Sequence, residues 1–280
     1  MWSSVRAAVI QKTATRDRDQ NLAAAGELVD GAAGDGAALI VLPEYFSVAG
    51  DPEDLRAGAE PLGGPTTTWA ADVARRHGVW LVAGSFPEAP ETPGGHLHNT
   101  SLLVAPDGTV AALYRKVHLF DTDVEGARSR ESATFAAGDK LCVVTAGDIE
   151  VGMSICYDLR FPELTRILAL RGATVVVVPS AFTATTGPPH WEVLLRARAI
   201  ENEVFVLAAG QVGDLPPGMP SCHGHSMIID PWGTVLAELD GSRTGYATAE
   251  LDLDGQRRIR EELPVLANRR PGAYRWPHGN

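Results

Sequence analysis

The chain has 280 residues, of which 45% are hydrophobic and 21% charged, a composition typical of a globular protein with enough apolar side chains for a core. Its formal net charge of −11 argues against nucleic acid or an anionic membrane as the main partner. The sequence has neither an apolar run of about 18 residues nor an apolar leader, and its three cysteines lack disulfide-framework spacing, so we expect a cytoplasmic protein.

The first third of the chain predicts apolar strands that alternate with helices. We expect strands at residues 5–10, 38–42 and 79–86, and helices at residues 16–33 and 66–77. Residues 51–65 and 87–95 are rich in glycine, proline and acidic side chains, and we expect them to be loops.

The remaining two thirds add hairpins to this pattern. Turn signals at residues 107–108, 147–148 and 231–233 each separate two apolar runs. Further strands are expected at residues 174–179, 204–209 and 246–253, and further helices at residues 161–172, 190–203 and 254–262. Because parallel winding alone needs no hairpins, we predict an α/β fold of mixed sheets covered by helices. We expect one domain over residues 1–280, with its core at about 5–262.

Cys156 lies between a predicted strand and a predicted helix. Apolar and polar residues alternate over 149–155, and Pro162 stands where the first turn of the helix is expected. Such a position holds a thiol between rigid flanks, and helix amides there favour its thiolate. Cys156 is therefore either a nucleophile or a buried core cysteine, and this stretch alone does not decide between them.

Three other residues are candidates for chemistry on local evidence. Glu44 ends an apolar run, where a carboxylate is either a partly buried base or the first solvated residue. Lys116 follows a hairpin strand among apolar neighbours, where it either stabilises an oxyanion or lies on the surface. His118 is a weaker candidate for the base, since no Asn or Asp spacing marks it, and Glu131 carries no local signal. The histidine spacing favours no metal site.

The segments around Glu44, Lys116 and Cys156 are more informative together, in their order along the chain, than each is alone. The chain reads Leu-Pro-Glu-Tyr-Phe at 42–46, Tyr-Arg-Lys-Val-His-Leu-Phe at 114–120 and Ile-Cys-Tyr-Asp-Leu-Arg-Phe-Pro-Glu at 155–163. This succession resembles the Glu–Lys–Cys arrangement of the nitrilase superfamily of carbon–nitrogen hydrolases, and the resemblance extends to about Tyr274.

Further segments resemble the Nit branch of that superfamily, which contains deaminated glutathione amidases and ω-amidases of α-ketoglutaramate. They are residues 116–121, 130–132, 179–202 and 224–233. Residues 180–182 and 209–211 are closer to the deaminated glutathione side, although Gly210 interrupts its usual Ala-Ala-Gln. Phe120-Asp121 is closer to the ω-amidase side, so the choice between the two stays open.

The resemblance implies a four-layer αββα sandwich and a mechanism without a cofactor. Glu44 would accept the thiol proton, and Cys156 would attack the amide carbon to form a thioester. Lys116 and the backbone amide of Tyr157 would hold the oxyanion. Glu131 matches a supporting glutamate that orients Lys116 and the substrate.

The resemblance also implies a small ω-amide substrate that carries a carboxylate. Arg160, Phe182 and Thr183 are the candidates to contact it, although Arg160 could instead form a salt bridge with Asp158 or Glu163. Helices 161–172 and 190–203 would pair two copies into a homodimer, with the tail 263–280 at the interface. The competing functions are ω-amidase, another small-amide or carbamoyl hydrolase, and a catalytically silent binding protein; the presence of all three triad residues disfavours the last.

Overall fold

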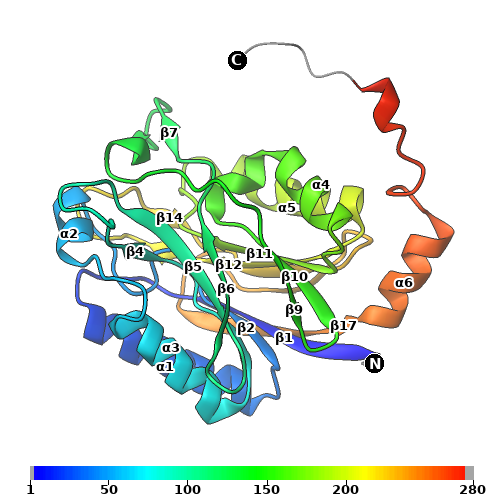
Figure 1. Cartoon of the computed structure of the whole chain (residues 1–280), viewed down its shortest axis with the longest axis horizontal. Helices are drawn as coiled ribbons and strands as arrows, with labels where there is room; N and C mark the ends of the chain where they lie inside the picture. Colours follow the sequence, from blue (N-terminus) through cyan, green and yellow to red (C-terminus); the bar gives the residue numbers. More distant parts are fainter. Residues whose placement is uncertain (1–2, 275–280) are drawn as a thin grey trace.

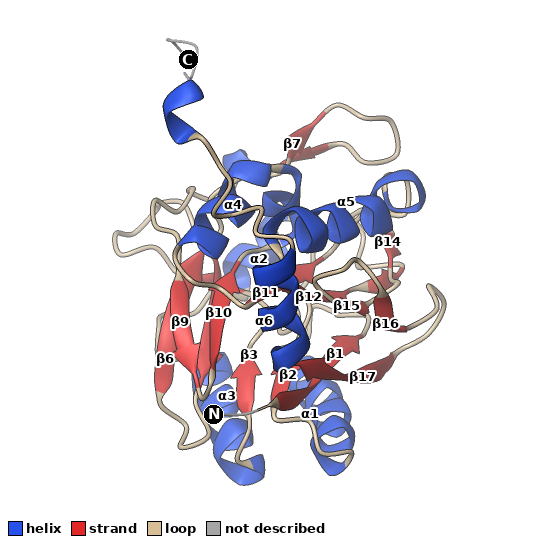
Figure 2. Cartoon of the chain, turned by 90° about the vertical axis from the view of Figure 1, so that its right-hand side faces the viewer, coloured by secondary structure: helices blue, strands red, loops and turns tan. Residues whose placement is uncertain are grey.

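A computed structural model describes residues 3–274 (Figure 1). Two stacked sheets form the centre of the molecule, and helices cover both outer faces. Helices α1 (Arg18–Gly34) and α3 (Pro65–His77) lie on one side, and α4 (Pro162–Leu170) and α5 (Gly187–Asn202) lie on the other. The side view in Figure 2 shows the same order of layers: helices, sheet, sheet, helices. The predicted four-layer α/β fold is therefore confirmed.

The first sheet contains seven strands, with both parallel and antiparallel pairs. In spatial order they are β17 (Gly245–Asp252), β1 (Ser4–Gln11), β2 (Leu39–Val41), β3 (Trp80–Val82), β5 (His98–Val104) and β4 (Phe86–Glu88), with β6 (Val110–Arg115) also on β5. Strands β1, β2 and β3 are parallel, whereas β17 returns from the end of the chain antiparallel to β1.

The second sheet contains six strands and has a parallel centre. In spatial order they are β16 (Val235–Glu238), β15 (Met227–Ile229), β12 (Phe205–Gly210), β11 (Val175–Ser180), β10 (Ile149–Met153) and β9 (Val143–Ala146). The pairs β5–β6, β9–β10 and β15–β16 are antiparallel, which confirms the three predicted hairpins and the mixed character of the sheets.

The core follows from the two-residue period of the strands. On β1, Ala7 and Val9 belong to the cluster between the two sheets, whereas Ala8 and Ile10 belong to the cluster beneath α1 and α3. Both faces of β1 are therefore buried, which explains its nearly continuous apolar sequence. Burying apolar surface on both faces is the main force that holds the four layers together.

Two local predictions were wrong. A short helix, α2 (Pro52–Ala57), replaces part of the loop expected at 51–65. Asp51 caps it by accepting from the backbone amides of Glu53 and Asp54, and Pro52 opens it. The single strand expected at 79–86 is two strands, β3 and β4. The backbone bends between them at Gly84, which has a φ of 29°, and a Cβ there would overlap the carbonyl oxygen of Pro43.

The chain ends outside the two sheets. Helix α6 (Leu253–Glu262) follows β17, and residues 263–274 continue past it as a mostly exposed tail (Figure 1). The expectation that the tail 263–280 lies at an interface falls partly outside the described residues. Within residues 3–274, none of the helices has both the length and the apolar character needed to span a bilayer.

Candidate active site

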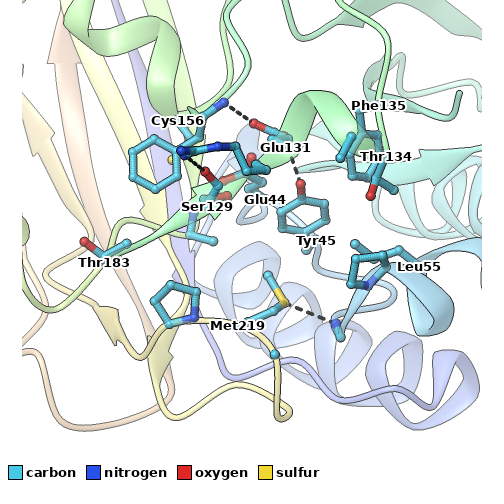
Figure 3. A pocket seen from close by; sticks show the side chains of 18 of the residues that line it. Glu44, Tyr45, Leu55, Ser129, Glu131, Thr134, Phe135, Cys156, Thr183 and Met219 are labelled. Atoms are coloured by element: carbon cyan, nitrogen blue, oxygen red, sulfur yellow. Dashed lines mark hydrogen bonds between the residues drawn. The ribbon is translucent and has the colours of Figure 1, made fainter. Parts of the chain in front are cut away.

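The three triad residues lie just after strand ends and meet between the two sheets. Glu44 follows β2 and Lys116 follows β6 in the first sheet, and Cys156 follows β10 in the second. The carboxyl ends of parallel strands commonly form such a site. The structure thus brings together Glu44, Lys116, Cys156 and the supporting Glu131, all of which are at least 90% buried (Figure 3).

Lys116 lies between two carboxylates. Its Nζ donates to Glu44 Oε1 at 2.9 Å and to Glu131 Oε1 and Oε2 at 3.0 and 2.8 Å. Burial lowers the pKa of Lys116, but the negative charges of Glu131 and Glu44 outweigh burial and hold it well above its usual value. Lys116 is therefore a fixed cation in the site and not a base.

Glu131 has no hydrogen-bond acceptor site left for a substrate. Oε1 accepts from Lys116, from Asn99 Nδ2 at 3.1 Å and from the hydroxyl of Tyr45 at 3.0 Å. Oε2 accepts from Lys116 and from the backbone amide of Phe120 at 2.6 Å. A carboxylate offers about four acceptor sites, so these five contacts leave none free. Glu131 fixes the position of Lys116.

Glu44 keeps one acceptor site free. Oε1 accepts from Lys116 and from Asn99 Nδ2 at 2.9 Å, and Oε2 accepts from the backbone amide of Ala181 at 2.7 Å. These three contacts leave a site on Oε2, and Glu44 and Cys156 are within hydrogen-bonding reach of each other. Glu44 is thus placed to accept the thiol proton.

The Cys156 thiol is neutral at rest. Burial raises its pKa well above the usual value, the nearby Glu44 raises it further, and the charge of Lys116 opposes both. The expectation that helix amides would favour a thiolate is therefore wrong. Cys156 opens a single 3-10 turn, Cys156–Arg160, and the predicted helix begins only at Pro162. Its φ of 46° is rare for a residue with a Cβ, and such strain is typical of functional positions.

Asp158 holds the turn that carries the nucleophile. It is fully buried and accepts from the backbone amide of Ile155 at 2.9 Å, from the Tyr114 hydroxyl at 2.7 Å and from the His118 backbone amide at 3.0 Å. The His118 ring contacts Asp158 at 2.7 Å and stacks on Phe161. His118 therefore supports this turn and is not the base.

The site opens into a cavity of about 340 Å³, a volume at the small end of the range for small-molecule sites. In Figure 3, Cys156, Glu44 and Glu131 lie together on one side, and Leu55 and Met219 lie across from them. Much of the cavity surface is apolar, and such a wall strengthens electrostatic interactions at the reacting groups.

Of the predicted substrate contacts, Thr183 lines the main cavity, but Phe182 and Arg160 do not. Phe182 and Arg160 line, with Tyr157 and Thr183, a second space of about 20 Å³ beside Cys156, enough for about one water molecule. Phe182 packs on Trp191 at a ring distance of 4.9 Å. The guanidinium carbon of Arg160 lies 5.0 Å from the centre of the Phe182 ring.

Arg160 does not form the alternative salt bridge. Its Nη1 lies 3.3 Å from Nδ1 of His190, and neither Asp158 nor Glu163 pairs with it within residues 3–274. Asp158 is instead occupied inside the turn described above. Arg160 therefore remains beside Cys156 without a carboxylate partner among the described residues.

Sequence reasoning missed Asn99, Tyr45 and Arg128. Asn99 bridges both glutamates from the start of β5, and Tyr45 reaches Glu131 from a left-handed backbone position with a φ of 57°. Arg128 lines the cavity from the loop before β8 (Ser129–Arg130). A polar side chain at the start of a buried strand is the signal that could have marked Asn99.

Across the described residues, the structure holds no cluster of three or more His, Cys, Asp or Glu side chains able to bind a metal ion.

Comparisons with known proteins agree with this geometry. The family model for carbon–nitrogen hydrolases matches residues 6–261. A deaminated glutathione amidase from Synechocystis sp. is 43% identical over 94% of this chain and 97% of its own length. An ω-amidase from Danio rerio is 39% identical over 97% of both chains. The solved structure of the C. elegans NitFhit protein is 37% identical with a TM-score of 0.91, over 98% of this chain and 66% of that longer one. By these matches, and as the motifs around Glu44, Lys116 and Cys156 predict, the chain belongs to the carbon–nitrogen hydrolase family.

Proposed function

We propose that this protein is an amidase that hydrolyses a small, carboxylate-bearing amide through a thioester on Cys156, with deaminated glutathione as its substrate. The observation that carries the proposal is the free acceptor site on Glu44, next to a neutral buried thiol and a buried lysine. These three groups supply the base, the nucleophile and the oxyanion donor that acyl transfer needs.

The first half of the reaction forms the acyl enzyme. Glu44 Oε2 takes the Cys156 proton as the sulfur attacks the amide carbon, because a thiol with a raised pKa is a poor nucleophile until its proton leaves. The carbonyl oxygen gains negative charge and accepts from Lys116 Nζ and the Tyr157 backbone amide. Collapse of this intermediate breaks the C–N bond, and Glu44 returns its proton to the leaving amine.

The second half releases the acid. Glu44, again ionised, removes a proton from a water molecule that attacks the thioester carbon, and the same two donors hold the oxyanion. Cys156 then leaves as the thiol by recovering the proton from Glu44. Lys116 keeps its charge throughout, since Glu131 and Glu44 hold its pKa high.

The substrate assignment rests on the relatives and on the cavity. The relatives named above include both a deaminated glutathione amidase and an ω-amidase, and the identity to the former is slightly higher. The cavity of about 340 Å³ opens away from Cys156 and leaves room for a leaving group larger than ammonia. Thr183, which lines the cavity, and Arg160, which lines the small space beside Cys156, remain the candidates to contact the acyl group.

We further propose that the protein works in the cytoplasm. All three cysteines are free, and a cysteine nucleophile needs a reducing compartment to stay reduced. Hydrolysis of α-ketoglutaramate is the second candidate function, favoured by the ω-amidase relative.

A product assay tests the proposal. Purified protein is incubated with deaminated glutathione or with α-ketoglutaramate, and cysteinylglycine and ammonia are quantified over time. We expect a higher kcat/KM with deaminated glutathione, no turnover by Cys156→Ala, and an acyl adduct on Cys156 in acid-quenched samples by mass spectrometry. A higher kcat/KM with α-ketoglutaramate would assign the second function, and absence of both products would leave a silent binding protein.

A further inference from the structure

We propose that Arg128 forms a binding subsite for a carboxylate on the leaving-group side of the scissile amide. The subsite would make the enzyme selective for amides whose amine portion ends in a free carboxylate, such as a C-terminal dipeptide. This inference deepens the proposed function and rests on it.

The position of Arg128 is fixed by its neighbours in the chain. Ala127, the residue before it, is fully buried, and its amide donates to the Val124 carbonyl at 2.9 Å. The Thr185 hydroxyl donates to the Gly126 carbonyl at 3.1 Å. The residues after Arg128 form β8, which pairs with β7 (Asp121–Thr122) in the small ribbon visible near the top of Figure 1. The backbone is thus held on both sides, which directs this one side chain to the cavity.

Among the cationic side chains that line the cavity within the described part of the chain, Arg128 is the one that forms no ion pair. Lys116 is bound by Glu44 and Glu131. Arg130 also lines the cavity, but its guanidinium donates to Asp123 and to the Thr122 and Ser129 carbonyls. Within residues 3–274, no carboxylate forms an ion pair with Arg128, and its side chain is exposed at the cavity mouth. A planar guanidinium without an ion-pair partner can donate two parallel hydrogen bonds to a carboxylate.

Much of the described cavity wall around Arg128 is apolar. Pro52, Leu55, Met219 and Pro220 line this side of the cavity with apolar surface. The Gly50 amide, which could contact an anion, donates to the Met219 sulfur at 3.1 Å. The distal carboxylate of an amide substrate would therefore pair with the guanidinium of Arg128.

The direction of the reaction assigns this subsite to the leaving group. During turnover the acyl group stays bonded to Cys156, which is 8% exposed, while the amine must leave through the mouth. A residue at the mouth therefore faces the amine portion. A shallower hollow lined by Glu125, Arg128 and Met219 continues the path outward, so a chain longer than ammonia extends past Arg128.

The test compares two substrates that differ only in the terminal carboxylate: deaminated glutathione and its C-terminal glycinamide. For the native enzyme we expect kcat/KM to favour the free acid about tenfold, mainly through KM, since an exposed Arg–carboxylate pair gives a modest gain. Arg128→Met should bring this ratio close to one, Arg128→Lys should keep part of it, and Arg128→Glu should invert it.

Arg130→Met is the matched control, because Arg130 lines the same cavity but is already paired. It should keep the native ratio. A native ratio near one, or an unchanged ratio in Arg128→Met, would overturn the subsite. Calorimetric binding of both peptides to Cys156→Ala protein gives a readout that needs no turnover. If adding Arg128→Met removes the difference in affinity between the two peptides, the subsite is supported, whether or not the native enzyme hydrolyses them. Failure of the native enzyme to hydrolyse either peptide would contradict only the proposed amidase reaction.

Discussion

At the scale of single residues, the site depends on how the acceptor sites of two carboxylates are filled. Glu131 is saturated and Glu44 has one site left, so two chemically identical side chains have different roles. Asn99 produces much of this difference, since its single amide group donates to Oε1 of both glutamates. Asn99 is a positioning residue, because it acts through Glu44 and does not contact the reacting atoms.

Asn99→Ala should lower kcat about 10- to 100-fold, because it removes two hydrogen bonds to charged groups and frees Glu44 to rotate away from Cys156. KM should change much less, since Asn99 does not line the cavity. Steady-state kinetics measure both values. Tyr45→Phe, which removes one contact to Glu131 only, should have a smaller effect on kcat. Equal effects of the two variants on kcat would contradict the role assigned to Asn99.

Lys116→Ala should reduce kcat at least 100- to 1000-fold, the usual effect of losing one oxyanion donor. It should also destabilise the fold by about 3–5 kcal/mol at pH 7, because the two buried carboxylates lose their common cation. Urea unfolding followed by circular dichroism measures the second effect. A Lys116→Ala protein with native activity would exclude Lys116 from the oxyanion site.

At the scale of elements, local turn chemistry determines what the sequence can predict. The three hairpins were predicted because their turn residues act over a few positions. Gly84 breaks a predicted strand for a long-range reason, the close approach of the Pro43 carbonyl, which no local pattern carries. Helix α2 did have a local signal, an Asp51-Pro-Glu-Asp54 start, but it lies in a stretch dominated by loop-forming residues.

Lys12, the residue after strand β1, gives the stability of the protein a measurable pH dependence. Lys12 is 1% exposed, and burial lowers its pKa to about 7. In the unfolded chain the pKa returns to its usual value of 10.5, so between these values the unfolded state binds more protons and stability rises with pH. Below pH 7 both states are protonated, and this contribution is constant.

Lys12→Met should therefore abolish a slope of up to about 1.4 kcal/mol per pH unit between pH 7 and 10. Urea unfolding free energies at three pH values in this window measure the slope. Lys140→Met, at an exposed position, is the control and should keep the native slope. Identical slopes for the native protein and Lys12→Met would show that Lys12 titrates normally in the folded state.

At the scale of the whole molecule, we propose a homodimer that pairs through α4 and α5. Large apolar side chains on these helices are exposed: Leu170 by 46%, Val193 by 67% and Ile200 by 47%. Exposed apolar patches of this kind mark association surfaces in soluble proteins. The side chain of Ile200 lies against Gly233, next to the exposed Trp232, which extends the patch beyond the helices.

Light scattering at micromolar concentration should give twice the chain mass of 29.7 kDa. Leu170→Glu combined with Ile200→Glu should give the single-chain mass, because charges buried at an interface destabilise it. Val110→Glu, at an exposed apolar position on β6, should leave the mass at twice the single-chain value. A native protein of single-chain mass would exclude the dimer.

Local sequence patterns could not predict that the site residues come together in space. Glu44 and Lys116 carry weak local signals and Glu131 carries none, because burial and mutual contact, not neighbouring residues, give these side chains their roles. The ordered motifs resembled a known superfamily, and that resemblance predicted that Glu44, Lys116 and Cys156 form one site. They did not supply Asn99 or Arg128, whose contribution depends on where a strand start and a loop meet the cavity.

The division of the site between the two sheets has a practical consequence. Base and lysine come from residues before the exposed pair Asp139–Lys140, and the nucleophile comes from residues after it. The second part also supplies β17, which pairs with β1 over eight residues. We expect a chain cut at this point to yield two inert fragments whose reassembly restores hydrolysis. Each fragment fused to one of two interacting proteins would therefore make the enzyme a reporter of their encounter in living cells.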